Sequence, residues 1–321
     1  MTGWRWLGLA VALLAGSAAG QQGGTVTTTR TLSLGTATPG GGFPLYGDAF
    51  AKVMTEADPG LPIVPRNTKG SNENIPLLER GELDLGLVAG EPAYQAFMGI
   101  DRPKTRLKIL TAIFSSPGLF VVRADSSYRN IRDLVGQMVV FGAKGSGLPI
   151  MSRYMLDGLG LKQDDDFHAI YLDRAGDGPA MVLDGQAAAL WGAGIGWPGF
   201  HAMASAPGGA RFIAPSAEEI AQVRAKHNFL KLLTVPANSY PGQSEAINSI
   251  GSWSYVLARE NLPDDVAYQL AKTLHGAEAT LCATLAQACE TTAANTVAAA
   301  PSLDLIHPGV LKYLREVGLA K

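Results

Sequence analysis

Two glycine-rich loops are the parts of this chain whose residue types and spacing could do chemistry. They are Thr38–Phe43 and Gly142–Gly147, and each follows a short apolar run that predicts a β-strand, at 32–34 and 138–141. A helix-forming stretch follows each loop, so unpaired N–H groups and the positive end of a helix dipole point past the strand end. Such an end favours an anion. Two copies of this unit predict two lobes that face one small acidic ligand.

Sequence motifs of common enzymes are missing from the chain. The five histidines are scattered without an HExxH pair, and no GxSxG elbow occurs. Gly142–Gly147 lacks the GK[ST] order of a phosphate-binding loop, and Gly192–Gly196 lacks the third glycine of a dinucleotide-binding loop. The run Asp164–Asp166 is more typical of a solvated turn than of a metal site. We therefore expect no catalytic residue, no metal and no cofactor, although an exported enzyme with His201 in its site is the rival hypothesis.

Three further loops rich in Gly, Ser and Asn follow predicted strands, at Gly70–Asn74, Ala89–Pro92 and Gly194–Trp197. Each alone is more typical of an ordinary tight turn. In open α/β sheets, however, ligands bind beyond the carboxyl ends of the strands, so five such loops together favour one site. Backbone N–H groups and the side chains of Ser71, Asn74 and Ser146 would suit a carboxylate. The aromatic residues Phe43, Tyr94 and Trp197 would either shield a ligand or pack in a core.

Strands and helices alternate from Thr31 onward, which predicts an α/β fold with a largely parallel sheet. We expect strands at 32–34, 61–64, 84–88, 107–114, 119–122, 138–141, 168–172, 187–191, 230–235 and 252–258. We expect helices at 46–56, 70–80, 149–159, 179–184, 217–226, 264–275, 278–288 and 311–317.

Two lobes follow from this order. The strands between the glycine units would carry the chain from one lobe to the other, and strand 252–258 would return it. We expect lobe 1 to contain residues 31–118 plus 245–321, with the C-terminal helices packed on it, and lobe 2 to contain residues 119–244. With 321 residues the chain is long enough for both cores.

The N-terminus predicts a cleaved signal peptide over residues 1–20. Arg5 supplies positive charge, the apolar run Leu7–Ala15 is too short to span a bilayer comfortably, and small residues follow it at 16–20. The mature protein is therefore expected to be exported. In an exported protein Cys282 and Cys289 are a disulfide candidate, with two free buried thiols as the alternative. A net charge of −2 gives no electrostatic reason to expect nucleic-acid binding.

At these residues the chain resembles the TAXI-type solute receptors of TRAP transporters. The resemblance covers nearly the whole mature chain, and the motifs are fairly specific only when taken together. They are Gly40–Gly47, Lys69–Leu78, Gly81–Val88, Ile131–Gly136, Gly145–Gly147, Ile306–Gly309 and Tyr313–Leu319.

The resemblance implies a type II-like periplasmic binding protein fold with hinge strands. It also implies a monomeric periplasmic receptor that closes on a small carboxylate and delivers it to the membrane subunits of a TRAP permease. Glutamate, glutamine or a 2-oxo dicarboxylate is the family's usual substrate class, and Glu91 would accept from a ligand amino group. The predicted ligand-binding residues are Gly41, Gly42, Phe43, Ser71, Asn74, Glu91, Tyr94, Gly145, Ser146, Gly147, Gly194 and Trp197.

Several positions depart from the family's polar pattern. Gly42, the pair Ala89-Gly90, Leu148 and Ala188 stand where polar residues are frequent, and tryptophans at 191 and 197 add apolar surface. We therefore predict a ligand less polar than glutamate, such as an aromatic or branched carboxylate. The loop Gly145–Gly147 would hold its carboxylate, with Phe43 and Trp197 deciding what is attached. A receptor for an ABC-type importer or a sensor kinase, and a protein-interaction module without a ligand, are further alternatives.

Overall fold

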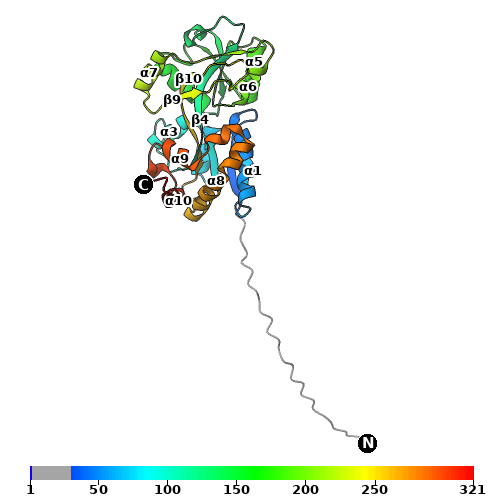
Figure 1. Cartoon of the computed structure of the whole chain (residues 1–321), viewed down its shortest axis with the longest axis vertical. Helices are drawn as coiled ribbons and strands as arrows, with labels where there is room; N and C mark the ends of the chain where they lie inside the picture. The colour runs from blue at the N-terminus through cyan, green and yellow to red at the C-terminus, as the bar shows by residue number, and fades with distance from the viewer. Residues whose placement is uncertain (2–29) are drawn as a thin grey trace.

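The computed structural model of this protein describes Met1 and residues 30–321 (Figure 1). Apart from Met1, the predicted signal peptide at 1–20 lies outside the described residues. No helix in the described part of the chain is both long and apolar enough to cross a membrane.

The first part of the chain forms three parallel strands with helices between them. The elements are β1 (Leu32–Gly35), α1 (Gly42–Ala57), β2 (Ile63–Arg66), α2 (Ser71–Glu79), β3 (Leu85–Val88) and α3 (Gly90–Met98). β1 pairs in parallel with both β2 and β3. The predicted crossover helices are therefore present, because parallel neighbours need such connections.

The middle of the chain repeats this pattern. Its elements are β4 (Lys108–Arg123), β5 (Met138–Ala143), α4 (Leu148–Gly158), β6 (His168–Leu172), α5 (Gly178–Leu183), β7 (Ala189–Ala193), α6 (Pro198–Ser205), β8 (Ala210–Ile213), α7 (Ala217–Lys226) and β9 (Lys231–Val235). β5 pairs in parallel with β6 and β7. The sequence did not predict α6 or β8.

The chain then returns to the first part. The closing elements are β10 (Ile247–Ala258), α8 (Asp264–Thr284), α9 (Ala293–Ala299) and α10 (Pro308–Glu316). The strand order is β2-β1-β3-β10-β4-β7-β5-β6, with β8 on β4 and β9 on β10. We call the part built on β1–β3 with α8–α10 lobe 1, and the part built on β5–β9 lobe 2. In Figure 1 the two lobes lie one above the other, with β4 and β10 running between them.

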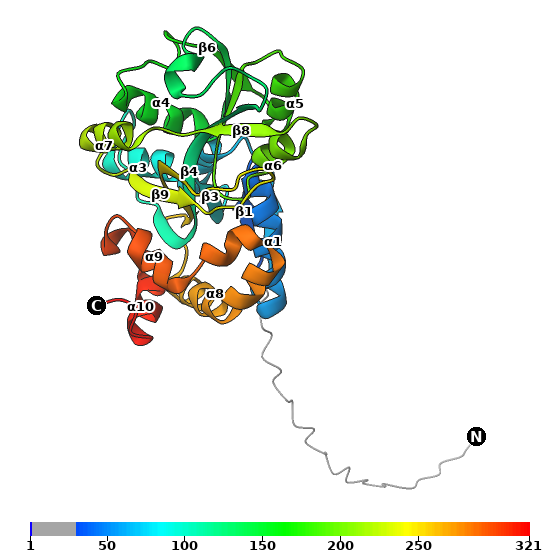
Figure 2. The same ribbon diagram turned by 45° about the horizontal axis from the view of Figure 1, so that its top comes forward.

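Each lobe has its own hydrophobic cores. In lobe 1, Phe50 of α1 packs with Leu270 of α8 and Leu314 of α10, so the C-terminal helices cover this lobe as predicted (Figures 1 and 2). In lobe 2, Phe120 packs with Trp191 and with Ile250 of β10. The start of β10 therefore belongs to the core of lobe 2 and its end to lobe 1.

Three segments that the sequence predicts to be loops or breaks lie within strands or helices. β4 is one strand through Ser115–Gly118, because β10 pairs with its first part and β7 and β8 with its last. α8 continues through Gly276, where its helical hydrogen bonds outweigh the modest cost of one glycine. α3 begins within Ala89–Pro92, which we had expected to be a loop, because proline is tolerated in the first turn of a helix.

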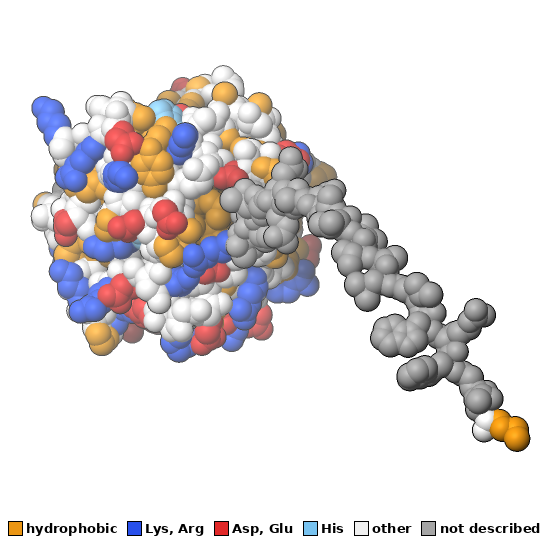
Figure 3. All heavy atoms as spheres, turned by 90° about the horizontal axis from the view of Figure 1, so that it is seen from below, with side chains coloured by type: hydrophobic (Ala, Val, Ile, Leu, Met, Phe, Trp, Pro, Cys, Tyr) orange, Lys and Arg blue, Asp and Glu red, His pale blue; other side chains and the backbone are white. Residues whose placement is uncertain are grey.

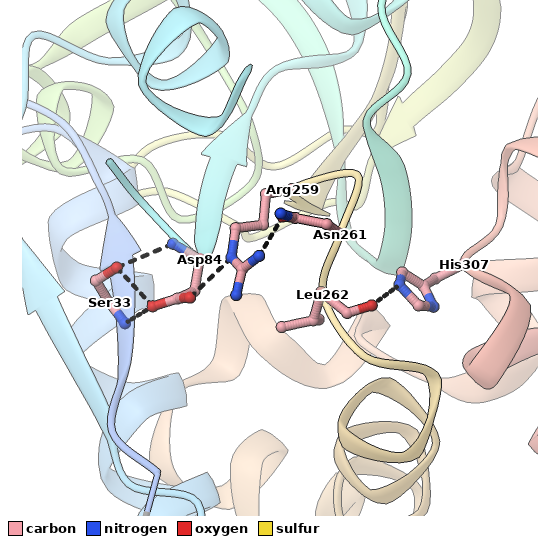
Figure 4. Close-up of polar contacts among 6 residues, drawn as sticks. All are labelled: Ser33, Asp84, Arg259, Asn261, Leu262 and His307. Atoms are coloured by element: carbon pink, nitrogen blue, oxygen red, sulfur yellow. Dashed lines mark hydrogen bonds and ion pairs between the residues drawn. The ribbon is translucent and has the colours of Figure 1, made fainter. Parts of the chain in front are cut away.

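Polar contacts tie the strands of lobe 1 together (Figure 4). The Asp84 carboxylate accepts hydrogen bonds from the Ser33 backbone N–H and hydroxyl and from Arg259 Nε, each at 3.0 Å. Burial raises the pKa of Asp84, but these hydrogen bonds outweigh it and leave the pKa lowered. His307 Nε2 donates to the Leu262 carbonyl at 3.0 Å, which joins the start of α10 to the β10–α8 connection.

The face seen in Figure 3 carries lysine and arginine side chains interspersed with aspartate and glutamate. On lobe 1, Cys282 and Cys289 form a disulfide that closes the turn between α8 and the segment after it.

Candidate functional site

A cavity of about 80 Å³ lies between the two lobes. Lobe 1 and the hinge strands contribute Ala37, Thr38, Gly41, Gly42, Phe43, Ala89, Glu91, Phe114, Ser116, Ser254 and Gln287. Lobe 2 contributes Ser146, Gly147, Leu148, Met151, Ala175, Ala193 and Trp197. Most of this lining is apolar, so a ligand with an apolar body would be desolvated there.

Four helices begin at the cavity wall. α1 starts at Gly42, α3 at Gly90, α4 at Leu148, and Trp197 is the residue before α6. A proline stands within the first three residues of each helix, which removes one N–H that would otherwise need a partner. The remaining N–H groups and the helix dipoles make the cavity favourable for negative charge.

The cavity lining contains seven of the predicted ligand-binding residues. They are Gly41, Gly42, Phe43, Glu91, Ser146, Gly147 and Trp197. The hydroxyl of Ser146 donates to the Ala143 carbonyl at 2.8 Å, so it already holds the loop before α4.

Ser71 and Asn74 do not line the cavity, although they were predicted to bind the ligand. Both are fully buried. The Ser71 hydroxyl accepts from the Ala89 N–H at 3.0 Å. Asn74 Nδ2 donates to the carbonyls of Thr36 and Leu87 at 2.8 Å each. The Ser71 hydroxyl and Asn74 Nδ2 therefore hold strand ends together, while Asn74 Oδ1 has no hydrogen-bond partner among the described residues.

Tyr94, Gly145 and Gly194 do not line the cavity either. Tyr94 stacks on Phe229 of lobe 2, with ring centroids 3.9 Å apart. Gly145 lies against Lys69, where its carbonyl accepts from the Asn72 N–H at 3.0 Å. Gly194 lies beside the side chain of Gln287. These residues belong to the contact between the lobes around the cavity.

Further cavity residues were missed by sequence reasoning. Phe114, Ser116 and Ser254 come from the hinge strands β4 and β10, where the Ser116 and Ser254 hydroxyl oxygens lie 3.3 Å apart. The sequence predicted a strand that ends at residue 114, and this strand end was the one feature that pointed to Phe114, Ser116 and Ser254. Gln287 follows α8 and carried no signal, because nothing in its neighbourhood along the chain marks it as a binding residue.

Glu91 is the charged side chain of the cavity. It is 1% exposed, and Ser252 Oγ donates to its Oε1 at 2.8 Å. Burial raises the pKa of Glu91 to about 7, and the hydrogen bond from Ser252 opposes this only in part. No lysine or arginine is among the described residues that line the cavity. Nor do the described residues include a group of three or more side chains that could hold a metal ion.

The lobes touch each other around the cavity. The Ala175 N–H donates to Thr38 Oγ1 at 3.2 Å, and Gln95 Nε2 donates to the Tyr154 hydroxyl at 3.2 Å. A Cβ added to Gly40 would lie 2.5 Å from the Cα of Gly176, so the backbones meet where neither residue has a side chain. The structure therefore has the cleft between the lobes closed.

Comparison with known proteins agrees with this architecture. Residues 34–318 match the model of the NMT1-like family. A structure described as a periplasmic transporter has a TM-score of 0.56 and 15% identity, over 89% of this chain and 93% of that one. Tv2483 bound to L-arginine has a TM-score of 0.51 and 13% identity, over 82% and 91%. The periplasmic aliphatic sulphonate binding protein SsuA from Escherichia coli has 19% identity over 89% and 78%, with a TM-score of 0.49. The predicted two-lobed α/β fold of periplasmic binding proteins is confirmed.

Proposed function

The chain belongs to the NMT1-like family, and on this basis, together with its fold and its cavity, we propose that it is an extracytoplasmic solute receptor. It binds a small organic carboxylate between its lobes. The observation that carries the proposal is the cavity between the lobes, whose walls come from both lobes and where four helices begin. A ligand that contacts both lobes only when they are closed shifts the population toward the closed state.

The size and lining of the cavity support a short branched ligand over an aromatic one. A volume of about 80 Å³ lies well below the roughly 300–1,000 Å³ of pockets for drug-sized ligands, so the cavity favours a small ligand. Valine and its 2-oxo counterpart are small branched acids of this class. Phe43, Phe114, Met151 and Trp197 supply the apolar surface for a branched chain.

The charges of the cavity support a ligand with both signs. The start of α4, directly after Gly147, favours the carboxylate, because the positive end of the helix dipole attracts an anion. Glu91 favours an ammonium group, because a buried carboxylate is stabilised by an opposite charge. We therefore favour an amino acid over an organic acid without an amino group.

The delivery step extends the same proposal. The signal peptide predicted at residues 1–20 would export the protein to the periplasm, where a monomer passes its ligand to a TRAP-type permease. Lobe 1 would comprise 31–118 plus 245–321 and lobe 2 would comprise 119–244, with hinges in β4 and β10, whose ends pack in the cores of both lobes. An ABC-type importer or a sensor kinase is the alternative partner. A neighbouring gene for a TRAP permease would support delivery to a TRAP-type permease, and a neighbouring ATPase gene would support an ABC-type importer.

Calorimetric titration of the purified mature protein tests the ligand class. The ligands are L-valine, 3-methyl-2-oxobutanoate, L-phenylalanine and L-glutamate, with L-valinamide as the matched control that lacks the carboxylate. We expect L-valine to bind most tightly and L-valinamide not to bind. If L-glutamate bound most tightly, the proposal of a branched ligand would be wrong. If none of the four acids bound, the proposed function as a receptor for small carboxylates would be wrong.

A further inference from the structure

Gln287 is a buried polar side chain with an unused hydrogen-bonding atom. It is 8% exposed and belongs to the lining of the cavity. Its Oε1 is fully buried and has no hydrogen-bond partner among the described residues. Buried polar groups in proteins are nearly always hydrogen-bonded, so an unpaired one needs a reason. An atom kept unpaired at a cavity wall is available to a ligand.

The neighbours of the Gln287 amide are glycines from both lobes. A Cβ added to Gly42 would lie 3.9 Å from both Nε2 and Oε1, and a Cβ added to Gly194 would lie 3.2 Å from Nε2. The amide therefore lies between the start of α1 and the loop before α6, in space that larger residues would fill. Because it contacts both lobes, a ligand bound to it would be held in the closed state.

The segment that carries Gln287 is anchored on both sides. The disulfide between Cys282 and Cys289 closes the turn that contains it. After it, the Glu290 carboxylate accepts from the Ser115 N–H at 2.9 Å and from its hydroxyl, which ties the segment to β4. A side chain on an anchored turn loses little further freedom when it binds a ligand.

We propose that Gln287 Oε1 accepts a hydrogen bond from the amino group of the bound ligand, and that the Cys282–Cys289 disulfide holds Gln287 in position for this contact. The inference rests on the proposed function and narrows it. Glu91 and Gln287 Oε1 are two buried acceptors in one cavity. A 2-amino acid has N–H donors for such acceptors, whereas its 2-oxo counterpart has no donor at that position.

The decisive experiment removes the amide while keeping its approximate size. Gln287→Leu is compared with the wild-type protein by calorimetric titration with L-valine and with 3-methyl-2-oxobutanoate. Loss of a hydrogen bond to a charged group should weaken L-valine binding about 10- to 100-fold. Binding of the 2-oxo acid should change less than about threefold. Gln222→Leu makes the same substitution at an exposed position on α7 and should change neither affinity.

Unfolding of the ligand-free variant separates binding from a structural role. Replacing an unpaired buried amide with an apolar group should leave the Tm unchanged or raise it. A lowered Tm with equal losses for both ligands would show that Gln287 is structural and would overturn the inference. Unchanged L-valine affinity in Gln287→Leu would overturn it as well. If the wild-type protein bound neither ligand, the proposed function itself would be wrong, and this outcome differs from a failure of the inference about Gln287 alone.

The disulfide is tested by Cys282→Ser combined with Cys289→Ser. Freeing the turn should weaken L-valine binding about 2- to 10-fold, the cost of immobilising one side chain. In the Gln287→Leu background the same change should have no further effect on L-valine. Equal losses in both backgrounds would mean that the disulfide does not act through Gln287.

Discussion

At the scale of single residues, the cavity is unusual because its charged side chain is a buried acid. Glu91 stands in the first turn of α3, where the helix dipole favours its negative charge, yet burial raises its pKa to about 7. Near neutral pH the residue is therefore close to half ionised. A ligand with an ammonium group would bind the ionised form of Glu91, and a ligand without one would favour the protonated form of Glu91.

Glu91→Gln should raise the stability of the ligand-free protein at pH 8 and reduce its preference for L-valine over 3-methyl-2-oxobutanoate. The folded pKa lies above the ordinary value of 4.5, so the folded state keeps a proton that the unfolded state loses. Stability therefore falls as the pH rises from about 4.5 to 7, and the cost is fully present above 7. It is on the order of 3 kcal/mol.

Thermal unfolding of both proteins at pH 4.5 and pH 8 checks this prediction. The gain in Tm from Glu91→Gln should be present at pH 8 and largely absent at pH 4.5. Glu245→Gln, an exposed position, is the control and should give no gain at either pH. An equal gain at both values would mean that the pKa of Glu91 is not raised.

At the scale of elements, α2 is fastened to the sheet by polar side chains that resemble ligand contacts. Asn74 Nδ2 donates to carbonyls at the ends of β1 and β3, and Ser71 meets the residue before α3. These bonds fix where the strand ends and the start of α3 lie relative to one another. The starts of α1 and α3 can then face the same cavity.

Asn74→Ala should destabilise the protein without changing the affinity of the folded protein for its ligand. Unpaired buried carbonyls of Thr36 and Leu87 should lower the free energy of unfolding by about 1–3 kcal/mol. Denaturant unfolding and titration with L-valine measure the two quantities. Asn248→Ala, exposed on β10, is the control. A loss of affinity without a loss of stability would instead make Asn74 a ligand-binding residue.

At the scale of the whole molecule, closure depends on positions where a glycine lies directly against the other lobe. Gly40 faces Gly176, and Gly145 faces Lys69. The stack of Tyr94 on Phe229 lies outside the cavity and adds an aromatic contact across the cleft. The cavity exists only while these contacts hold, so side chains far from the ligand can change its affinity.

Gly145→Ala should therefore hinder closure. The new Cβ would lie 2.7 Å from the Lys69 carbonyl oxygen in the closed form, a distance that real Cβ atoms do not adopt. We expect L-valine affinity to fall roughly tenfold or more, because the ligand must also oppose this clash. Small-angle scattering should show less compaction on ligand addition than in the wild-type protein.

Gly276→Ala is the matched control, because a Cβ at this position of α8 would meet nothing within 4 Å. It should leave affinity and compaction unchanged and stabilise α8 by about 0.5–1 kcal/mol. If Gly145→Ala kept the affinity and compaction of the wild-type protein, the lobes would not need this contact in order to close.

The local elements of the fold were predictable because their signals lie close together in the chain. The two strand–glycine loop–helix units at 32–57 and 138–158 follow from apolar runs and glycines, and most of the other strands are read in the same way. The same loops led to the cavity residues Gly41–Phe43 and Ser146–Gly147. Here the sequence by itself was sufficient, since chain direction and helix ends follow from neighbouring residues.

Tertiary structure alone decided how these loops became one site. Ser71 and Asn74 look like ligand contacts in sequence, but Asn74 Nδ2 donates to backbone carbonyls at strand ends and Ser71 Oγ accepts from the Ala89 N–H. Phe114 and Gln287 meet the loops only because β4 passes between the lobes and the chain returns after α8. Contacts between residues so far apart leave no local pattern. The physical reason is that the cavity is formed by the packing of two lobes and not by any one segment.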